Sequence, residues 1–461
     1  MRFFCCFFIV LFLINSPIFP QSYKIKVKID GLKDTTVLLA YHFRDKIFTV
    51  DSVFLNSKGK GIAKDEKALL QGQYLIYLPN GKYFDILIDD DQRFAIYNKS
   101  ENFVDKFRSK GSKSNKLLCK FTREINAINN ELNTIQKLKL NARDNKDSVN
   151  FYNSQIAEKH REQQSLMEEI RAGDSENLFY SLMKTTLEPQ IPEEIKVKDS
   201  LEQFMFYKKH FLDDIDFTDS RLIRSNHLYY KINQYLTRIV YQHYDSVAFA
   251  ADQIIEKTPP KSEMRQFITE HLLGFFALSK YMTHRNIFVH LAEKYYLSGQ
   301  AFWSDSAKLK KIEERVNSIK PTLVDKIAPD LKVLREDFSP TSLHELVADY
   351  TILFIYEPGC GHCREYTPKI KSLSDKYWLK GLEVFALYTL IDVEEWLKFI
   401  KDNELENWNN VFDPNRVSNF YDVYNVITTP RLYLLDNNKK IILSDVGYEQ
   451  IRDYLRYVFG E

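Results

Sequence analysis

The feature that most constrains this chain is a pair of cysteines at the junction of an expected strand and an expected helix. Residues 351–356 form an unbroken apolar and β-branched run, which is typical of a strand buried on both faces. Pro358 and Gly359 interrupt that run. The motif Cys360-Gly361-His362-Cys363 follows and opens a segment, residues 364–380, that is expected to be helical. A Cys-x-x-Cys pair in this setting is typical of a redox site.

Elementary electrostatics explains why such a pair suits redox chemistry. A helix N-terminus carries unpaired N–H groups and the positive end of the macrodipole, so a thiolate at Cys360 is stabilised there. Cys363 lies about one helical turn further on, within reach of a disulfide. Half of a zinc site is the alternative, but it needs two further ligands. The sequence holds no second Cys-x-x-Cys and no His-x-x-x-His, so neither a metal nor a cofactor is expected.

Length and composition indicate a multidomain globular protein. A chain of 461 residues is long enough for two to four domains, and 44% hydrophobic with 28% charged residues excludes general disorder. The formal net charge of +1 gives no reason to expect nucleic acid or an anionic membrane surface as a partner.

The N-terminal residues predict export. Met1-Arg2 precede an apolar run over residues 3–14, which fits a secretory signal over residues 1–21 and is too short for a comfortable transmembrane helix. We therefore expect a location in the periplasm or cell envelope. An uncleaved signal anchor is the alternative, and the only membrane attachment expected. Cys5 and Cys6 leave with a cleaved signal, and Cys119 is expected to be a buried, inert thiol.

The pattern of hydrophobic residues changes twice along the rest of the chain. Residues 22–108 alternate at period two in short runs, with a hairpin signal at Asn80-Gly81, which predicts a small β-sandwich or barrel. Residues 109–322 change to helical period, broken by prolines, and predict an α-helical domain. Residues 323–461 predict a single α/β layer fold that begins with a short strand and a helix at 342–347. The acidic run Asp89-Asp90-Asp91 is expected to be a solvated turn.

The last segment resembles the thioredoxin superfamily, and within it the exported TlpA/ResA-type proteins. The resemblance rests on Ala328-Pro329-Asp330, the strand ending at Tyr356, Cys360-Gly361-His362-Cys363, Pro368 and Thr428-Thr429-Pro430. The three-part order of the whole chain looks like multidomain thioredoxin-like proteins of Bacteroidota. The resemblance implies a thioredoxin-like fold over residues 323–461 and a thiol–disulfide oxidoreductase. Its partners would be protein thiols and disulfides together with an unidentified redox partner.

The resemblance also assigns roles to residues at matching positions. Cys360 would attack a substrate disulfide as thiolate, and Cys363 would resolve the mixed disulfide. The backbone of Thr429 would pair with the substrate chain beside Pro430, whose peptide bond is cis in that superfamily. Tyr356 occupies the place of an aromatic residue that is usually tryptophan.

Two questions about this site stay open, the proton acceptor for Cys363 and the direction of electron flow. The superfamily's buried acid is replaced by Phe354, so the proton acceptor for Cys363 is Glu357, Glu365 or water. His362 beside Cys360 favours oxidation or isomerisation of substrates, because a partly charged imidazole stabilises the thiolate, whereas the fold resemblance favours a reductant. The direction of electron flow stays open.

Two other functions compete with disulfide exchange. An envelope-associated binding protein with a vestigial site is suggested by the large portion outside the thioredoxin-like segment. A thiol peroxidase shares the fold, but peroxiredoxins carry threonine three residues before the nucleophile, where this sequence has Glu357.

Overall fold

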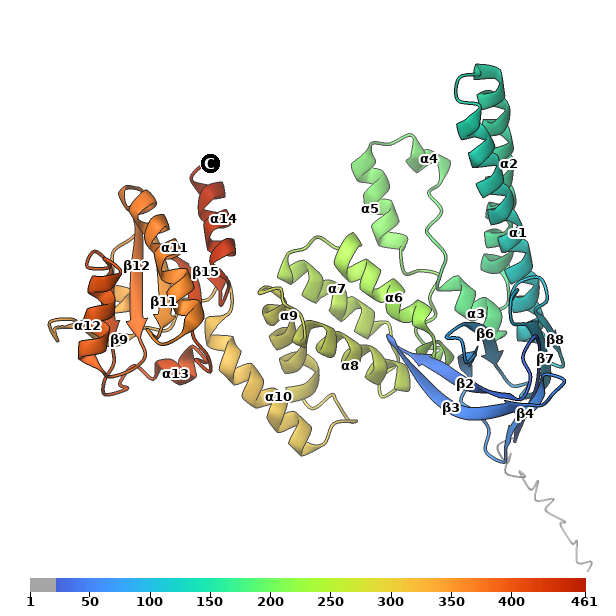
Figure 1. Ribbon diagram of the computed structural model, residues 1–461, viewed down its shortest axis with the longest axis horizontal. Helices are drawn as coiled ribbons and strands as arrows, with labels where there is room; N and C mark the ends of the chain where they lie inside the picture. The colour runs from blue at the N-terminus through green and yellow to red at the C-terminus, as the bar shows by residue number, and fades with distance from the viewer. Residues whose placement is uncertain (1–21) are drawn as a thin grey trace, which may run out of the picture. The chain divides into compact units, whose positions relative to one another are not determined.

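A computed structural model describes residues 22–461, and Figure 1 shows the elements in order. The predicted signal, residues 1–21, lies outside the described residues. The described chain divides into two compact units, one ending at Ile239 and one from Val240 to Glu461. The predicted fold class is confirmed, since β-sheets come first, helices follow, and a sheet with helices ends the chain. The division at residue 239 falls within the predicted helical domain, and the predicted domain limits stay predictions.

The first unit begins with two four-stranded sheets whose inner faces share one core. In β1, buried residues such as Ile25 and Val27 alternate with exposed lysines. The core joins them to Val37, Leu39 and Ile76 of the other sheet, which makes a β-sandwich. The strand orders are β4-β1-β7-β8 and β3-β2-β5-β6. The strands are β1 Tyr23–Asp30, β2 Thr35–Phe43, β3 Lys46–Leu55, β4 Lys60–Asp65, β5 Gly72–Tyr77, β6 Tyr83–Ile88, β7 Arg93–Lys99 and β8 Arg108–Lys110.

Helices complete the first unit. The two longest, α1 and α2, run side by side as an antiparallel pair (Figure 1). Each starts at a side-chain cap, because Ser112 accepts the N–H of Asn115 and Asn145 accepts the N–H of Ser148. The helices are α1 Lys113–Asn141, α2 Lys146–Ala172, α3 Leu178–Lys184, α4 Glu193–Lys196, α5 Ser200–His210 and α6 Asn226–Gln234.

Asp89 and Cys119, for which the sequence allowed a prediction, are both buried in this unit. The run Asp89-Asp90-Asp91 was expected to be a solvated turn, and Asp90 and Asp91 are exposed, but for Asp89 the prediction is wrong. Its carboxylate accepts hydrogen bonds from Ser114 Oγ at 2.5 Å and from the N–H of Leu178 at 3.3 Å, so it fastens the sandwich to α1 and α3. Cys119 is buried as predicted, and burial raises the pKa of its thiol to about 12.

The second unit starts with four helices and ends in a seven-stranded sheet. The helices are α7 Tyr244–Glu256, α8 Glu263–Ala277, α9 His284–Leu291 and α10 Ser306–Ile319. The sheet order is β10-β9-β13-β12-β11-β14-β15, with β11 parallel to β12 and antiparallel to β14. The strands of this sheet and the helices around it are, in chain order, β9 Lys332–Arg335, β10 Pro340–Ser342, β11 Tyr350–Tyr356, α11 Gly361–Tyr377, β12 Leu382–Tyr388, α12 Val393–Asp402, β13 Asn409–Phe412, α13 Phe420–Val423, β14 Arg431–Asp436, β15 Ile441–Ser444 and α14 Tyr448–Val458.

Both faces of this sheet are covered, which explains the continuous apolar run of β11. Ile352, Phe354 and Tyr356 pack in one core with residues of α11, α12 and α14. Leu353 and Ile355 face the opposite core, which includes residues of α13. Alternate residues of one strand therefore enter two different cores.

One local prediction for this domain needs correction, and two short elements were missed. The expected helix over 342–347 is not formed, because Ser342 ends the strand β10 and only Leu343–Glu345 make a short 3₁₀ turn. The short elements β13 and α13 were not predicted. The buried strands and the longer helices agree with the sequence pattern to within a few residues.

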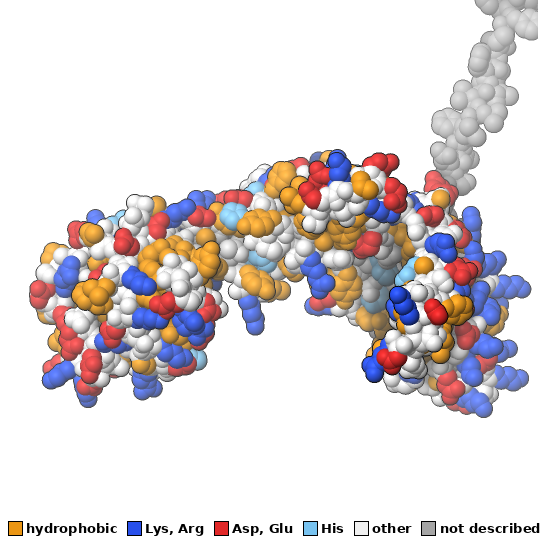
Figure 2. Space-filling view, turned by 90° about the horizontal axis from the view of Figure 1, so that it is seen from above, with side chains coloured by type: hydrophobic (Ala, Val, Ile, Leu, Met, Phe, Trp, Pro, Cys, Tyr) orange, Lys and Arg blue, Asp and Glu red, His pale blue; other side chains and the backbone are white. Residues whose placement is uncertain are grey.

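The surface of the second unit, at the left of Figure 2, mixes basic, acidic and hydrophobic side chains on the visible face. Over residues 22–461, no helix combines the length and hydropathy that crossing a bilayer requires.

Candidate functional site

The cysteine pair lies where β11 gives way to α11. Cys360 is the N-cap residue of α11, and its Sγ accepts the backbone N–H of Cys363 at 3.2 Å. A thiol thus takes the position that serine or aspartate fills at most helix starts. Cys360 is partly exposed, whereas Cys363 is fully buried, and both are free thiols. The first cysteine can meet a large substrate, and the second can be reached only from within the site.

The two thiols differ in acidity. Burial opposes ionisation of Cys360, but hydrogen bonds from the Cys363 thiol and from backbone N–H groups of Cys363 and His362 outweigh it, so the pKa of Cys360 is lowered. Burial, reinforced by the neighbouring Cys360, raises the pKa of Cys363 to about 12. The lowered pKa favours Cys360 as the nucleophile of the pair, and the raised pKa keeps the proton on Cys363 while Cys360 is charged.

This difference predicts the pH dependence of alkylation by iodoacetamide. Only the thiolate reacts, so the rate at Cys360 should rise with pH and level off with a midpoint below 9.0, the ordinary value of a thiol. The same lowered pKa stabilises the reduced fold above the unfolded-state pKa, and this stabilisation is lost as the pH falls through the folded value. Mass spectrometry of each cysteine gives the profile. A midpoint at or above 9.0, or faster labelling of Cys363, would contradict the assignment.

The loop before β14 contacts the reactive sulfur. The peptide bond between Thr429 and Pro430 is cis, and the Thr429 carbonyl accepts the Cys360 thiol hydrogen at 3.3 Å. The structure thus brings Cys360 and Thr429, 69 residues apart, into one site. The same carbonyl is available to a substrate backbone once the thiol has lost its proton.

Tyr356 supports the site from behind and does not face solvent. Its ring is fully buried and stacks on Phe354, with centroids 4.9 Å apart. Its hydroxyl accepts the indole N–H of Trp396 at 3.1 Å. This contact ties the end of β11 to α12, so Tyr356 positions the cysteine loop.

The two candidate acids and His362 occupy different surroundings. Glu365 is exposed and pairs with Lys369 at 2.6 Å and with His362 at 3.7 Å. Glu357 is half-buried and accepts the hydroxyl of Thr389 at 3.0 Å. Within residues 22–461, no hydrogen bond joins Cys363 Sγ to either carboxylate. The imidazole of His362 is directed towards Glu365, and its backbone N–H is the part that lowers the pKa of Cys360.

Sequence reasoning missed two residues that complete the site. Thr389 follows β12, and its N–H donates to the Tyr356 carbonyl at 3.2 Å. Trp396 lies in α12 and holds Tyr356. The signal for Thr389 was present, because parallel strands end at one sheet edge and β11 and β12 are neighbours. The described residues contain no cluster of three or more His, Cys, Asp or Glu that could hold a metal.

Comparison with known proteins agrees with this geometry. Residues 324–444 match the model of the AhpC/TSA family, and residues 151–320 match a domain of unknown function, DUF5106. A domain of a possible thiol-disulfide isomerase from Cytophaga hutchinsonii is 38% identical over 30% of this chain and 95% of its own, with a TM-score of 0.29. A thioredoxin-like protein from Bacteroides caccae is 20% identical over 59% of this chain and 98% of its own, with a TM-score of 0.47. No curated protein matched.

The fold and the site together define a thioredoxin-like redox domain. Its marks are a sheet covered on both faces, a partly exposed cysteine of lowered pKa at a helix N-terminus and a cis-proline loop against that sulfur. The chain is a multidomain protein whose C-terminal part, residues 324–444, is a thioredoxin-like domain that matches the AhpC/TSA family.

Proposed function

We propose that this protein is an exported thiol–disulfide oxidoreductase that exchanges disulfides with protein substrates through Cys360 and Cys363. The observation that carries the proposal is the asymmetry of the pair. Cys360 is accessible with a lowered pKa beside the Thr429 carbonyl, and Cys363 is buried with a raised pKa. The export part of the proposal rests on the apolar run over residues 3–14.

The proposed reaction proceeds in two displacements. The Cys360 thiolate attacks one sulfur of a substrate disulfide, whose S–S bond breaks and releases a substrate thiolate. The mixed disulfide removes the charge from Cys360 and with it part of what raises the pKa of Cys363. Cys363 then loses its proton and attacks the Cys360 sulfur, which releases the second substrate thiolate. Two electrons pass from the dithiol to the substrate, and the reverse sequence oxidises a substrate dithiol.

Glu357, Glu365 and water were the candidates for the group that accepts the proton of Cys363. Glu365 is engaged by Lys369 and lies in solvent, away from a sulfur that is fully buried. Glu357 lies on the loop that joins β11 to the cysteines, and among residues 22–461 only Thr389 donates a hydrogen bond to its carboxylate. We therefore favour Glu357, acting directly or through water, over Glu365.

The test of the proposal is the reduction potential of the Cys360–Cys363 couple in the signal-free protein, equilibrated in graded thiol–disulfide buffers. A single two-electron couple is expected. A value near about −270 mV identifies a reductant, and a value between about −180 and −120 mV identifies an oxidant or isomerase. If no disulfide forms at any ratio of thiol to disulfide in the buffer, the redox proposal fails. A binding protein with a vestigial site then takes its place.

Replacing His362 by proline is expected to make the couple more reducing by about 30 mV or more. Proline lacks the N–H that helps to lower the pKa of Cys360, so the reduced form loses stability. Position 362 lies in the first turn of α11, where proline is tolerated.

His362→Ala is the matched control, since it removes the imidazole and keeps the N–H. It should move the potential less than His362→Pro does. If the alanine variant moves the potential as far as the proline variant, the side chain controls the potential and the backbone assignment is wrong.

A thiol peroxidase remains the second enzymatic alternative, because the family whose model matches residues 324–444 is AhpC/TSA. Against it, position 357 holds a glutamate whose carboxylate accepts a hydrogen bond from Thr389. Consumption of hydrogen peroxide by the parent, lost in Cys360→Ser, would support the peroxidase. Equal, background consumption by the two proteins would exclude it.

A further inference from the structure

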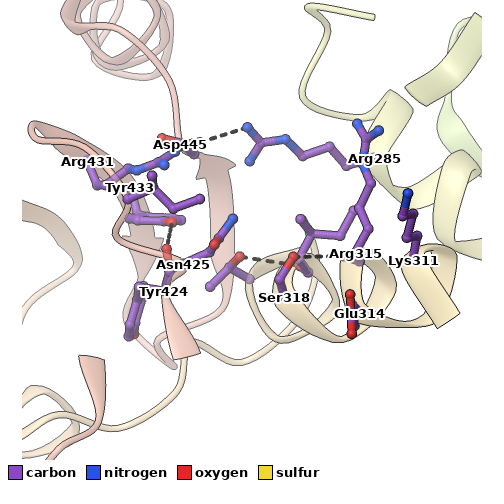
Figure 3. A pocket seen from close by; sticks show the side chains of 13 residues that line it. Arg285, Lys311, Glu314, Arg315, Ser318, Tyr424, Asn425, Arg431, Tyr433 and Asp445 are labelled. Atoms are coloured by element: carbon purple, nitrogen blue, oxygen red, sulfur yellow. Dashed lines mark hydrogen bonds and ion pairs between the residues drawn. The ribbon is translucent and has the colours of Figure 1, made fainter. Parts of the chain in front are cut away.

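A charged cavity lies next to the cis-proline loop, inside the second compact unit. Its volume is about 520 Å³. Figure 3 shows Tyr424, Asn425 and Tyr433 of the thioredoxin-like domain on one side and residues of α10 on the other. Arg285 reaches across towards Asp445. A cavity of this size is within the range of about 300–1,000 Å³ that ligand sites occupy.

The lining of the cavity has an excess of positive charge. Four cationic and two anionic side chains surround it, a net charge of +2. Enclosure between two protein walls lowers the local screening, so this excess attracts anions more strongly than the same charges on an open surface would. The cations are Arg285, Lys311, Arg315 and Arg431, and the anions are Glu314 and Asp445.

The cations are not all neutralised by neighbours. Asp445 is shared by two guanidinium groups, Arg285 at 2.7 Å and Arg431. The Nε atom of Arg431 is buried and has no hydrogen-bond partner among the described residues. Lys311 is exposed on α10, and within residues 22–461 it forms no ion pair. The exposed ammonium group of Lys311, on the lining of this cavity, is the complement of an incoming carboxylate.

The cavity is also adjacent to the redox centre along the chain. Ile427 and Arg431 line it, and these two residues stand on either side of Thr429 and Pro430. The Thr429 carbonyl accepts the Cys360 thiol. An extended chain advances about 3.3 Å per residue, so a substrate segment beside Thr429 reaches the cavity within a few residues of its own cysteine.

We propose that this cavity binds acidic side chains of the substrate protein that flank the cysteine under attack. The proposal rests on the proposed function and names its substrate class, polypeptides with aspartate or glutamate near the reactive disulfide. The specificity comes from Arg285, Lys311 and Arg315, which precede the thioredoxin-like domain in the chain. Helices outside the redox domain therefore contribute to the choice of substrate.

The test compares disulfide-linked peptides that differ only beside the cysteine, with two aspartates in one and two asparagines in the other. The parent protein, signal-free but otherwise whole, should exchange the aspartate peptide with a kcat/KM about tenfold higher. The ratio should shrink as the salt concentration rises, because the attraction is screened.

Variants of Lys311 locate the preference. In Lys311→Gln the ratio of the two kcat/KM values should be about threefold lower than in the parent. In Lys311→Glu the ratio should be close to one. Lys332→Glu is the matched control and should keep the parent ratio, because β9 lies towards the opposite edge of the sheet from β14 and β15. Lys311 and Lys332 are both exposed, so neither substitution disturbs a core.

Each other outcome has a definite meaning. Equal rates for both peptides in the parent, or an unchanged ratio in Lys311→Glu, overturn the cavity assignment and leave the redox proposal standing. A Lys311 effect on the small carboxylated disulfide dithiodiglycolate, without one on the peptides, assigns the cavity to a small anion and overturns the protein-substrate assignment. The neutral hydroxyethyl disulfide tests the proposed function separately. If the parent neither reduces this disulfide nor oxidises its thiol to it, the proposed function itself has failed.

Discussion

Serine in place of Cys360 should lower the rate of disulfide exchange by at least about 10³-fold, because the only accessible nucleophile of the pair is lost. Serine in place of Cys363 should also stop turnover, but at a different step. Cys360 would still attack the substrate, and the mixed disulfide would persist because no resolving thiol remains. The Cys360→Ser variant should therefore form no mixed disulfide with the substrate, whereas the Cys363→Ser variant should accumulate it.

Exchange assays and non-reducing electrophoresis with mass spectrometry distinguish the two cases. Cys119→Ser is the control, since Cys119 is buried in the first unit and contributes to its core. It should exchange disulfides like the parent. An adduct carried by Cys363 in the Cys360→Ser variant would reverse the assigned roles. Turnover by that variant at the parent rate would remove the site from the reaction altogether.

Trp396→Ala should cost about 3–5 kcal/mol of the free energy of unfolding of the thioredoxin-like domain. Trp396 is fully buried and stacks on Tyr388, with centroids 5.7 Å apart and planes at 4°. Its ring also lies 4.7 Å from that of Phe412, and its N–H donates to Tyr356. The truncation opens a cavity at the centre of the aromatic cluster and frees the residue that ends β11.

Denaturant unfolding followed by circular dichroism measures this loss, and two variants calibrate it. Trp378→Ala removes a tryptophan that is 60% exposed and should change stability by less than about 1 kcal/mol. Tyr356→Phe leaves the buried Trp396 N–H without its acceptor and should cost about 1–3 kcal/mol. If Trp396→Ala costs no more than Trp378→Ala, the aromatic cluster does not hold the cysteine loop in place.

Both predictions concern the same piece of architecture. The cysteine loop is anchored by β11 on one side and by the N-terminus of α11 on the other. Tyr356 and Trp396 fix the end of β11, and the Cys363 N–H fixes Cys360. A rigid support lets the two sulfurs keep their difference in acidity while substrates of different shape bind.

Much of this site was predictable from local sequence. The apolar run over 351–356 and the Cys-x-x-Cys pair specify a buried strand followed by a helix, because both patterns act over neighbouring residues. The period-two alternation over residues 23–29 predicted the strand β1, and the helical period of residues 116 onwards predicted the helix α1, for the same reason. Short segments such as β4 and β13 were missed, since four to six weakly patterned residues become strands only by pairing with β1 and β12.

The sequence by itself determined the class of domain and the order of β, α and α/β segments, and it predicted Cys360 as the nucleophile and Cys363 as its partner. Only the tertiary structure decided that Trp396 holds Tyr356 and that Glu365 is engaged by Lys369. It also placed Arg285 and Lys311 around a cavity beside Thr429 and Pro430. The physical reason is separation along the chain. Spacing and periodicity report on groups within a few residues, whereas burial, ion pairing and cavities depend on which distant segments pack together.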